Sequence, residues 1–217
     1  HKILTGRKKG FDSLRKYHGM SGFPKRDESN CDAFDTGHSS TSLSAGLGMV
    51  CARELKKDKY TVVSVIGDGS LTGGLAFEAL NNAASLKSNY IMILNDNHMS
   101  ISENVGGLSH YLAGVRTAKG YTNFKKNVKA SLSKMNAIGE ELERNIRRAK
   151  SMLKQVFIPG MFFEDMGITY LGPIDGHNIE ALTEVIEDAK QVEGAVLIHV
   201  ITEKGKGYEP AQLHPES

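Results

Sequence analysis

Short apolar runs alternate with amphipathic stretches along most of this chain. Residues 61–66, 90–94 and 195–202 are apolar runs, rich in β-branched residues, of the kind used by strands buried on both faces. Between them, residues 73–87 and 179–191 carry apolar positions at helical spacing. Strands that alternate with helices predict an α/β fold, with a parallel sheet covered by helices on both faces.

Three further stretches complete the predicted domain. Residues 43–57 predict a helix that contains Gly46 and Gly48, and because glycine is unfavourable inside a helix we expect close packing against another backbone there. Residues 168–171 predict another strand. Residues 1–36 are rich in Gly, Ser, Lys and Asp with little periodicity, so we expect a loop-like segment.

Residues 103–157 differ in character from the rest and predict a helical insertion. Over residues 121–157 the stretch is charged, with apolar positions every three or four residues. Such a stretch can be an amphipathic helix that packs on the domain and faces solvent. It can also be a mobile cover over a site, which is a frequent role of long insertions between strands.

Composition sets broad limits on the class of protein. A hydrophobic content of 40% and a charged content of 24% are typical of a soluble globular protein, and no apolar run is long enough to span a membrane. The net charge of +2 and the two cysteines give no sign of a nucleic-acid partner or a disulfide framework, so we expect a cytoplasmic protein without nucleic-acid or membrane partners. The chain starts without Met, and we expect residues 1–217 to be one domain truncated at both ends.

Two polar triplets follow the first two predicted strands. Gly-Asp-Gly stands at 67–69 and Asn-Asp-Asn at 95–97. In a parallel βαβ unit both turns lie at the same edge of the sheet, so we expect Asp68 and Asn97 to lie side by side. Their oxygen atoms suit Mg²⁺, and a helix that begins after Gly69 would direct N–H groups at an anion. The pair therefore predicts a metal–diphosphate site, although an ordinary crossover can also carry a polar turn at each strand end.

The spacing of the two triplets resembles the signature of thiamine diphosphate enzymes, and further segments narrow the resemblance. These segments are HKILTGR at 1–7, SGFPKR at 21–26, GHSSTS at 37–42, GDGSLTGG at 67–74, NDNHMSISENVG at 95–106, LGPIDGH at 171–177 and KGKGYEPA at 204–211. Over nearly its whole length the chain resembles the first, diphosphate-binding domain of the 1-deoxy-D-xylulose 5-phosphate synthase family. The resemblance implies the thiamine diphosphate-binding fold, and transketolases are not expected to carry GHSSTS or NDNxMSIS.

The resemblance also implies a reaction. Members of this family are thiamine diphosphate- and Mg²⁺-dependent transferases that condense pyruvate with D-glyceraldehyde 3-phosphate to 1-deoxy-D-xylulose 5-phosphate and CO₂. This is the first step of non-mevalonate isoprenoid synthesis and also feeds thiamine synthesis. A homodimer and further domains of the same protein are implied as partners, and this segment by itself is expected to be inactive.

Residue roles follow from the same resemblance. Asp68, the Asn97 side chain and the Met99 backbone carbonyl are implied as Mg²⁺ ligands. Catalytic roles are implied for His1 and His38. The implied cofactor-binding residues are His1, Gly37, His38, Ser39, Gly69, Ser70, Asn97 and Tyr208.

Other interpretations stay open at several of these positions. His38 can simply fix a turn, Tyr208 can serve in packing, and His177 in LGPIDGH is expected to hold its own turn. Two other functions compete with the synthase. One is a subunit of a split transketolase-like enzyme, and the other is a non-catalytic Mg²⁺–diphosphate binding module.

Overall fold

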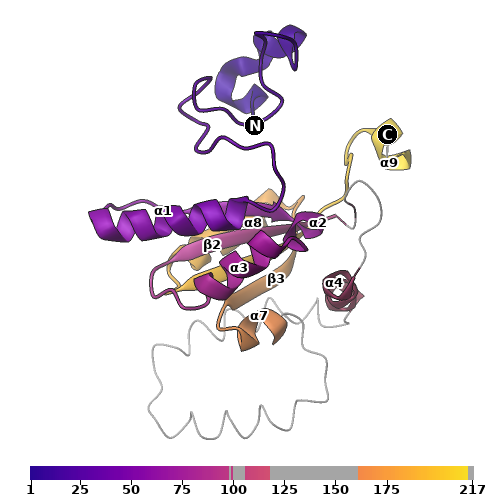
Figure 1. Ribbon diagram of the computed structural model, residues 1–217. Helices are drawn as coiled ribbons and strands as arrows, with labels where there is room; N and C mark the ends of the chain where they lie inside the picture. The colour runs from indigo at the N-terminus through magenta and orange to yellow at the C-terminus, as the bar shows by residue number, and fades with distance from the viewer. Residues whose placement is uncertain (98, 100–105, 118–160, 215–217) are drawn as a thin grey trace, which may run out of the picture.

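A four-stranded parallel sheet forms the centre of the molecule (Figure 1). The computed structural model describes residues 1–97, 99, 106–117 and 161–214. The strand order is β1-β2-β4-β3, and each neighbouring pair is parallel. The bounds of the strands are β1 (Val63–Gly67), β2 (Tyr90–Asp96), β3 (Thr169–Asp175) and β4 (Ala195–Ile201). The predicted parallel α/β fold is confirmed.

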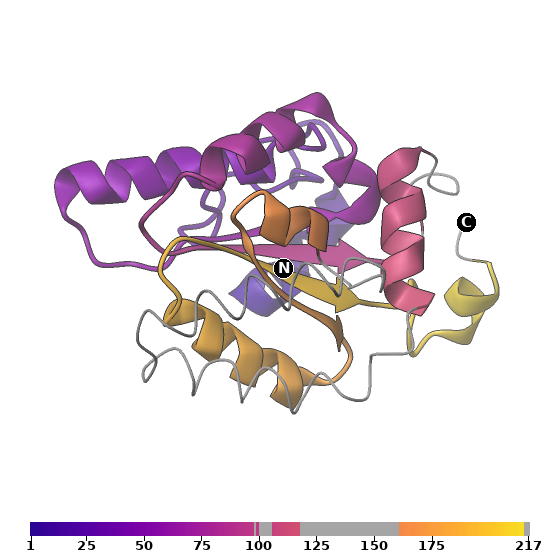
Figure 2. The ribbon, with the colours of Figure 1, turned by 90° about the horizontal axis from the view of Figure 1, so that it is seen from below.

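Helices lie on both faces of this sheet, as predicted. Figure 2 shows α1 and α3 on one side of the strands and α8 on the other. In both views α4 and α9 lie beyond the carboxyl ends of the strands (Figures 1 and 2). The bounds of the helices are α1 (Ser42–Lys56), α2 (Asp68–Leu71), α3 (Gly74–Ala83), α4 (Gly107–Thr117), α7 (Met161–Asp165), α8 (Ile179–Lys190) and α9 (Glu209–Leu213).

Each face of the sheet has its own apolar core because strand side chains alternate between faces. On the first face, buried residues of α1, α3, α4 and α7 pack against Tyr90, Met92 and Leu197 of the central strands. On the second face, α8 packs against Val196 and Ile198. The second face of β1 is less well covered, since Val63 and Val65 remain exposed there.

The main difference from the predicted elements lies just after β1. The apolar pattern predicts one helix over residues 73–87, but the chain forms the four-residue α2 first and then α3, which ends at Ala83. Between the two helices Gly73 adopts an extended conformation and no side chain caps α3. The Gly-Asp-Gly turn thus spans the last residue of β1 and the start of α2, and α3 begins only after the break at Gly73.

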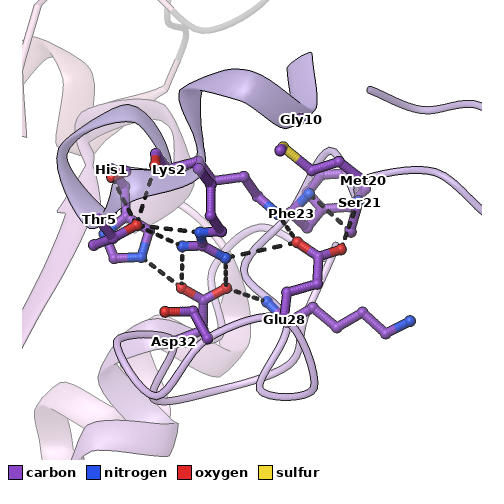
Figure 3. A network of polar contacts seen from close by, with 12 residues as sticks. His1, Lys2, Thr5, Gly10, Met20, Ser21, Phe23, Glu28 and Asp32 are labelled. Atoms are coloured by element: carbon purple, nitrogen blue, oxygen red, sulfur yellow. Dashed lines mark hydrogen bonds and ion pairs between the residues drawn. The ribbon is translucent and has the colours of Figure 1, made fainter. Parts of the chain in front are cut away.

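The segment at 1–36 is more ordered than its composition predicts. It forms two short helical turns, η1 (Ile3–Arg7) and η2 (Lys8–Ser13), and lies apart from the sheet in Figure 1. A buried carboxylate organises it (Figure 3): Asp32 accepts from Arg7 Nη1 at 2.8 Å, Arg7 Nη2 at 2.7 Å and the Lys25 N–H at 2.7 Å. The Arg7 guanidinium holds the pKa of Asp32 at about 2. Charge pairing thus takes the place of an apolar core in this segment.

Helix α1 offers a matched pair of glycines for a stability test. A Cβ at Gly46 would lie 2.1 Å from Ser64 Oγ and 2.6 Å from Tyr90 Oη, whereas a Cβ at Gly48 would meet open space. Gly46 is therefore closely packed, but against side chains and not against the backbone that was expected, and at Gly48 the expected close packing is wrong. We predict that Gly46→Ala lowers the free energy of unfolding by about 1–3 kcal/mol through overpacking. Gly48→Ala should raise it by about 0.5–1 kcal/mol through helix propensity. Denaturant unfolding of both variants checks this, and a shift of the same sign in both would contradict it.

The predicted insertion over residues 103–157 is only partly described. Its described part contains α4, which contributes the buried Leu112 to the first core. Residues 118–157 lie outside the described part of the chain, and so do the two interpretations given for them. Within the described ranges, none of the helices has the length and apolar character needed to cross a lipid bilayer.

Candidate functional site

Two buried acids meet at the carboxyl edge of the sheet. Gly67 of β1 pairs in register with Asn95 of β2, so the two strands end side by side. Asp68 is the first residue of α2 and Asp96 is the last residue of β2; their exposed fractions are 4% and 0%. Their carboxyl groups lie near each other, close enough for Asp96 to raise the pKa of Asp68. The two polar triplets therefore lie together as predicted, and Asp96 lies near Asp68.

This contact changes the acidity of Asp68. Burial and the neighbouring Asp96 carboxyl together raise the pKa of Asp68 to about 6, against a hydrogen bond from the Gly69 N–H that favours the ionised form. Two acids in contact cannot both ionise cheaply unless a cation lies beside them. The chemistry of this pair therefore fits a divalent cation bound by oxygen atoms.

The next turn supplies further oxygen atoms. Asn97 Oδ1 accepts a hydrogen bond from the Met99 N–H at 3.1 Å, which closes the turn directly after Asp96. Within the described residues no group of three or more His, Cys, Asp and Glu side chains forms a metal cluster. A site with few protein ligands is what Mg²⁺ commonly uses, because it keeps several waters and takes oxygen atoms from phosphate.

The segment that contains Gly37, His38 and Ser39 comes just before α1 in the chain and contacts α2 through Ser40. Ser40 Oγ donates to the Ser70 carbonyl at 2.7 Å, and a Cβ at Gly73 would lie only 2.4 Å from Ser40 Oγ. Gly73 is thus required for this close approach, which brings the GHSSTS segment beside the Gly-Asp-Gly turn. Gly37, His38 and Ser39 are exposed, and Gly69 and Ser70 are partly buried.

Two details of this region modify the sequence-based expectations. The helix expected to begin after Gly69 begins at Asp68 and ends at Leu71, so it is too short to act as a strong dipole at an anion. The His38 N–H donates to Thr36 Oγ1 at 3.2 Å, a contact that fits the turn-forming interpretation of this residue. The exposed imidazole of His38 is still available to a ligand.

His1 and Tyr208 lie in separate parts of the chain. His1 Nε2 lies 2.6 Å from Asp32 Oδ1, in the polar network of the N-terminal segment (Figure 3). Tyr208 is 66% exposed and precedes α9, which lies at the same end of the sheet as α2 (Figure 1). The described contacts of these two residues do not join either of them to Asp68.

His177 has the structural role expected from the sequence. Its Nε2 accepts a hydrogen bond from the Glu203 N–H at 2.9 Å, and its own N–H donates to Asp175 Oδ1 at 2.9 Å. The imidazole therefore ties the turn after β3 to the segment after β4.

A buried hydrogen-bonded line behind the two acids was not predicted from the sequence. His199 Nε2 lies 2.9 Å from Asp96 Oδ2, and His199 Nδ1 lies 2.7 Å from Tyr170 Oη. Burial raises the pKa of Tyr170 above its ordinary value, so its hydroxyl stays protonated. A signal for this line was present in the sequence, because a single His inside an apolar strand such as β4 requires polar partners.

Solved structures with a similar fold are transketolases. The transketolase of Campylobacter jejuni matches 92% of this chain and 26% of its own, with a TM-score of 0.60 and 20% identity. The transketolase of Leishmania mexicana matches 92% of this chain and 25% of its own, with a TM-score of 0.57 and 16% identity. At these identities the likeness establishes the transketolase-like fold.

Sequence relatives are closer. The 1-deoxy-D-xylulose-5-phosphate synthase of Lachnoclostridium phytofermentans is 60% identical over 99% of this chain, and that of Clostridium acetobutylicum is 58% identical over 99%. These matches cover 34% and 35% of the relatives, so the chain spans about a third of their length. The family model described as 1-deoxy-D-xylulose-5-phosphate synthase matches residues 1–202. The chain therefore belongs to the 1-deoxy-D-xylulose-5-phosphate synthase family.

Proposed function

We propose that this chain is the Mg²⁺–thiamine diphosphate-binding part of a synthase that condenses pyruvate with D-glyceraldehyde 3-phosphate. The observation that carries the proposal is the pair of buried acids, Asp68 and Asp96, at neighbouring strand ends on the carboxyl edge of the sheet, where ligands of open α/β sheets bind. Family membership connects this acid pair to the synthase reaction. The same protein would supply the remaining domains, and we propose a homodimer as its assembly.

The residues of this chain would bind and orient the cofactor. Asp68, the Asn97 side chain and the Met99 carbonyl would hold Mg²⁺. Gly69 and Ser70 would contact the diphosphate through backbone N–H groups and a hydroxyl, with the neighbouring Ser40 contact fixing their position. When bound, thiamine diphosphate supplies the electron sink that decarboxylation of a 2-oxo acid requires.

The remaining proposed contacts come from outside the acid pair. Gly37, His38 and Ser39 precede α1 and are brought toward α2 through Ser40. His1 and Tyr208 would contact the cofactor or substrate from the N-terminal segment and from the start of α9. His1 and His38 are the proposed catalytic residues of this chain, since imidazoles can move protons near neutral pH.

The test uses the full-length protein that carries this segment. With Mg²⁺ and thiamine diphosphate present, we expect release of CO₂ from pyruvate to depend on D-glyceraldehyde 3-phosphate. One 1-deoxy-D-xylulose 5-phosphate should form for each CO₂. Transfer of a two-carbon unit from a ketose, with no use of pyruvate, would instead support the split transketolase-like enzyme. Cofactor binding without turnover of any of these substrates would support the non-catalytic binding module.

A further inference from the structure

A line of polar side chains crosses the first face of the sheet from its far edge to the acid pair. It begins at Tyr170 on β3, passes His199 on β4 and Asp96 on β2, and ends at Asp68 beside β1. Three strands thus contribute directly, and β1 contributes through the first residue of α2, which follows it. The exposed fractions are 4% for Tyr170, 0% for His199 and Asp96, and 4% for Asp68.

The register of the strands accounts for this alignment. Tyr170 pairs with Leu197, and His199 stands two positions further along β4 on the same face. Asp96 pairs with Ile201, again two positions beyond His199. The residues are therefore diagonal neighbours on successive strands, a separation that long side chains bridge. The line follows from the parallel register, which is regular up to Leu171 of β3 and shifts just beyond it, between Leu171 and Ile174.

The hydrogen-bond directions along the line are fixed by its two ends. An ionised Asp96 oxygen only accepts, so His199 Nε2 carries the hydrogen that points to it. In a neutral imidazole the other nitrogen then accepts, and Tyr170 Oη donates to it at 2.7 Å. The Asp96 carboxylate thereby determines which nitrogen of His199 carries the hydrogen, and His199 determines the direction in which the Tyr170 hydroxyl donates.

Packing holds the distal end of the line in place. The Phe163 ring stacks on Tyr170 with centroids 5.9 Å apart and an interplanar angle of 5°. On the same strand, β3, Gly172 has φ +137°, and a Cβ there would lie 2.6 Å from the His199 carbonyl oxygen and 3.0 Å from its Cβ. The backbone of β3 therefore approaches the backbone and Cβ of His199 closely, which fixes the place from which the imidazole extends.

We propose that His199 and Tyr170 are positioning residues for the metal site, and that they act through Asp96 to fix the place of the Asp68 carboxyl group at that site. This inference rests on the proposed function, because the cation belongs to the proposed Mg²⁺–diphosphate site. Residues that support a metal ligand from behind commonly contribute 10- to 100-fold to metal affinity. Loss of the imidazole should leave Asp96 free to reorient beside Asp68.

The buried hydroxyl of Tyr90 serves as the comparison, because it has a structural role without a link to the acid pair. Tyr90 Oη donates to the Leu43 carbonyl at 2.8 Å and lies 2.9 Å from Ser64 Oγ, so its contacts join β2 to α1 and β1. It stands at the opposite end of β2 from Asp96. Tyr90→Phe and Tyr170→Phe therefore each remove one buried tyrosine hydroxyl. Only the hydroxyl of Tyr170 belongs to the line of side chains that ends at Asp68.

The experiment measures cation affinity in the full-length protein with thiamine diphosphate present. Mg²⁺ dissociation constants come from calorimetry, and the electron paramagnetic resonance spectrum of Mn²⁺ reports the symmetry of the bound ion. We expect His199→Leu to weaken Mg²⁺ binding about 10- to 100-fold and to alter the Mn²⁺ spectrum. His199→Gln can still donate to Asp96, so it should restore affinity to within about threefold of the unmodified protein. Tyr170→Phe should weaken binding about three- to tenfold, and Tyr90→Phe should not change it.

Two results separate this inference from the function on which it rests. If Asp68→Asn abolishes binding while Tyr170→Phe shifts the dissociation constant no more than Tyr90→Phe, the positioning role is overturned and the metal site stands. If Asp68→Asn binds Mg²⁺ as tightly as the unmodified protein, the metal assignment itself is wrong. The Tyr170 and Tyr90 comparison decides the matter even where His199→Leu fails to fold.

Discussion

Asp68→Asn is expected to abolish Mg²⁺-dependent binding of thiamine diphosphate to the full-length protein. Asp68 is the buried carboxylate directly after β1, and it is the charged member of the proposed ligand set. An amide in its place keeps the shape but removes the charge that offsets the dehydration of Mg²⁺. We expect affinity to fall more than about 100-fold, beyond the range typical of outer partners of a metal ligand.

Calorimetry with and without Mg²⁺ measures this effect directly. Asp58→Asn is the matched control, because Asp58 is an exposed carboxylate near the end of α1. We expect this control to bind the cofactor as the unmodified protein does. Unchanged affinity in Asp68→Asn would exclude Asp68 as a metal ligand.

Cation binding is also expected to weaken steeply in mild acid. The pKa of Asp68 is raised to about 6 by burial and by Asp96, above its ordinary value of 3.8. Below that pKa a cation must displace a proton, so its affinity should fall up to about tenfold for each pH unit below 6 and level off above it. The same shift means that, without a cation, Asp68 stabilises the folded protein most below pH 3.8. This contribution is lost as the pH rises through about 6.

The measurement for this second effect is Mn²⁺ binding without thiamine diphosphate, followed by the resonance of free Mn²⁺ between pH 5 and pH 8. Leaving out the diphosphate keeps the titration of phosphate groups from contributing. Asp58→Asn should show the same profile as the unmodified protein. Constant affinity across the whole range would show that Asp68 is ionised throughout.

Much of the fold follows from residue patterns. The apolar runs at 61–66 and 195–202 are strands in a parallel sheet, because such runs bury on both faces and the stretches between them are amphipathic. The meeting of the two polar triplets follows from the same topology. Family membership was visible in the short motifs, and the comparisons confirm it.

Other features depend on neighbours that periodicity does not reveal. The break between α2 and α3 is fixed by the close approach of Ser40 to Gly73, a contact between distant segments. Asp96 was not among the residues predicted for the site, although alternation along β2 turns it toward the first face, where it lies near Asp68. The N-terminal segment is organised by Asp32, whose charge pairs give no periodic signal.

The polar line across the sheet has a consequence for how the protein folds. Asp68 and Asp96 belong to one local β1-α-β2 unit, whereas His199 stands 103 positions from Asp96 in the chain. Closing a loop of that size carries an entropic cost, and contacts between distant segments slow folding. A chain in which only the local unit has formed would have both acids but lack the imidazole behind them. Full cation affinity would then require that β4 has paired with β2. A time-resolved refolding experiment that follows cation affinity would therefore report on this late step.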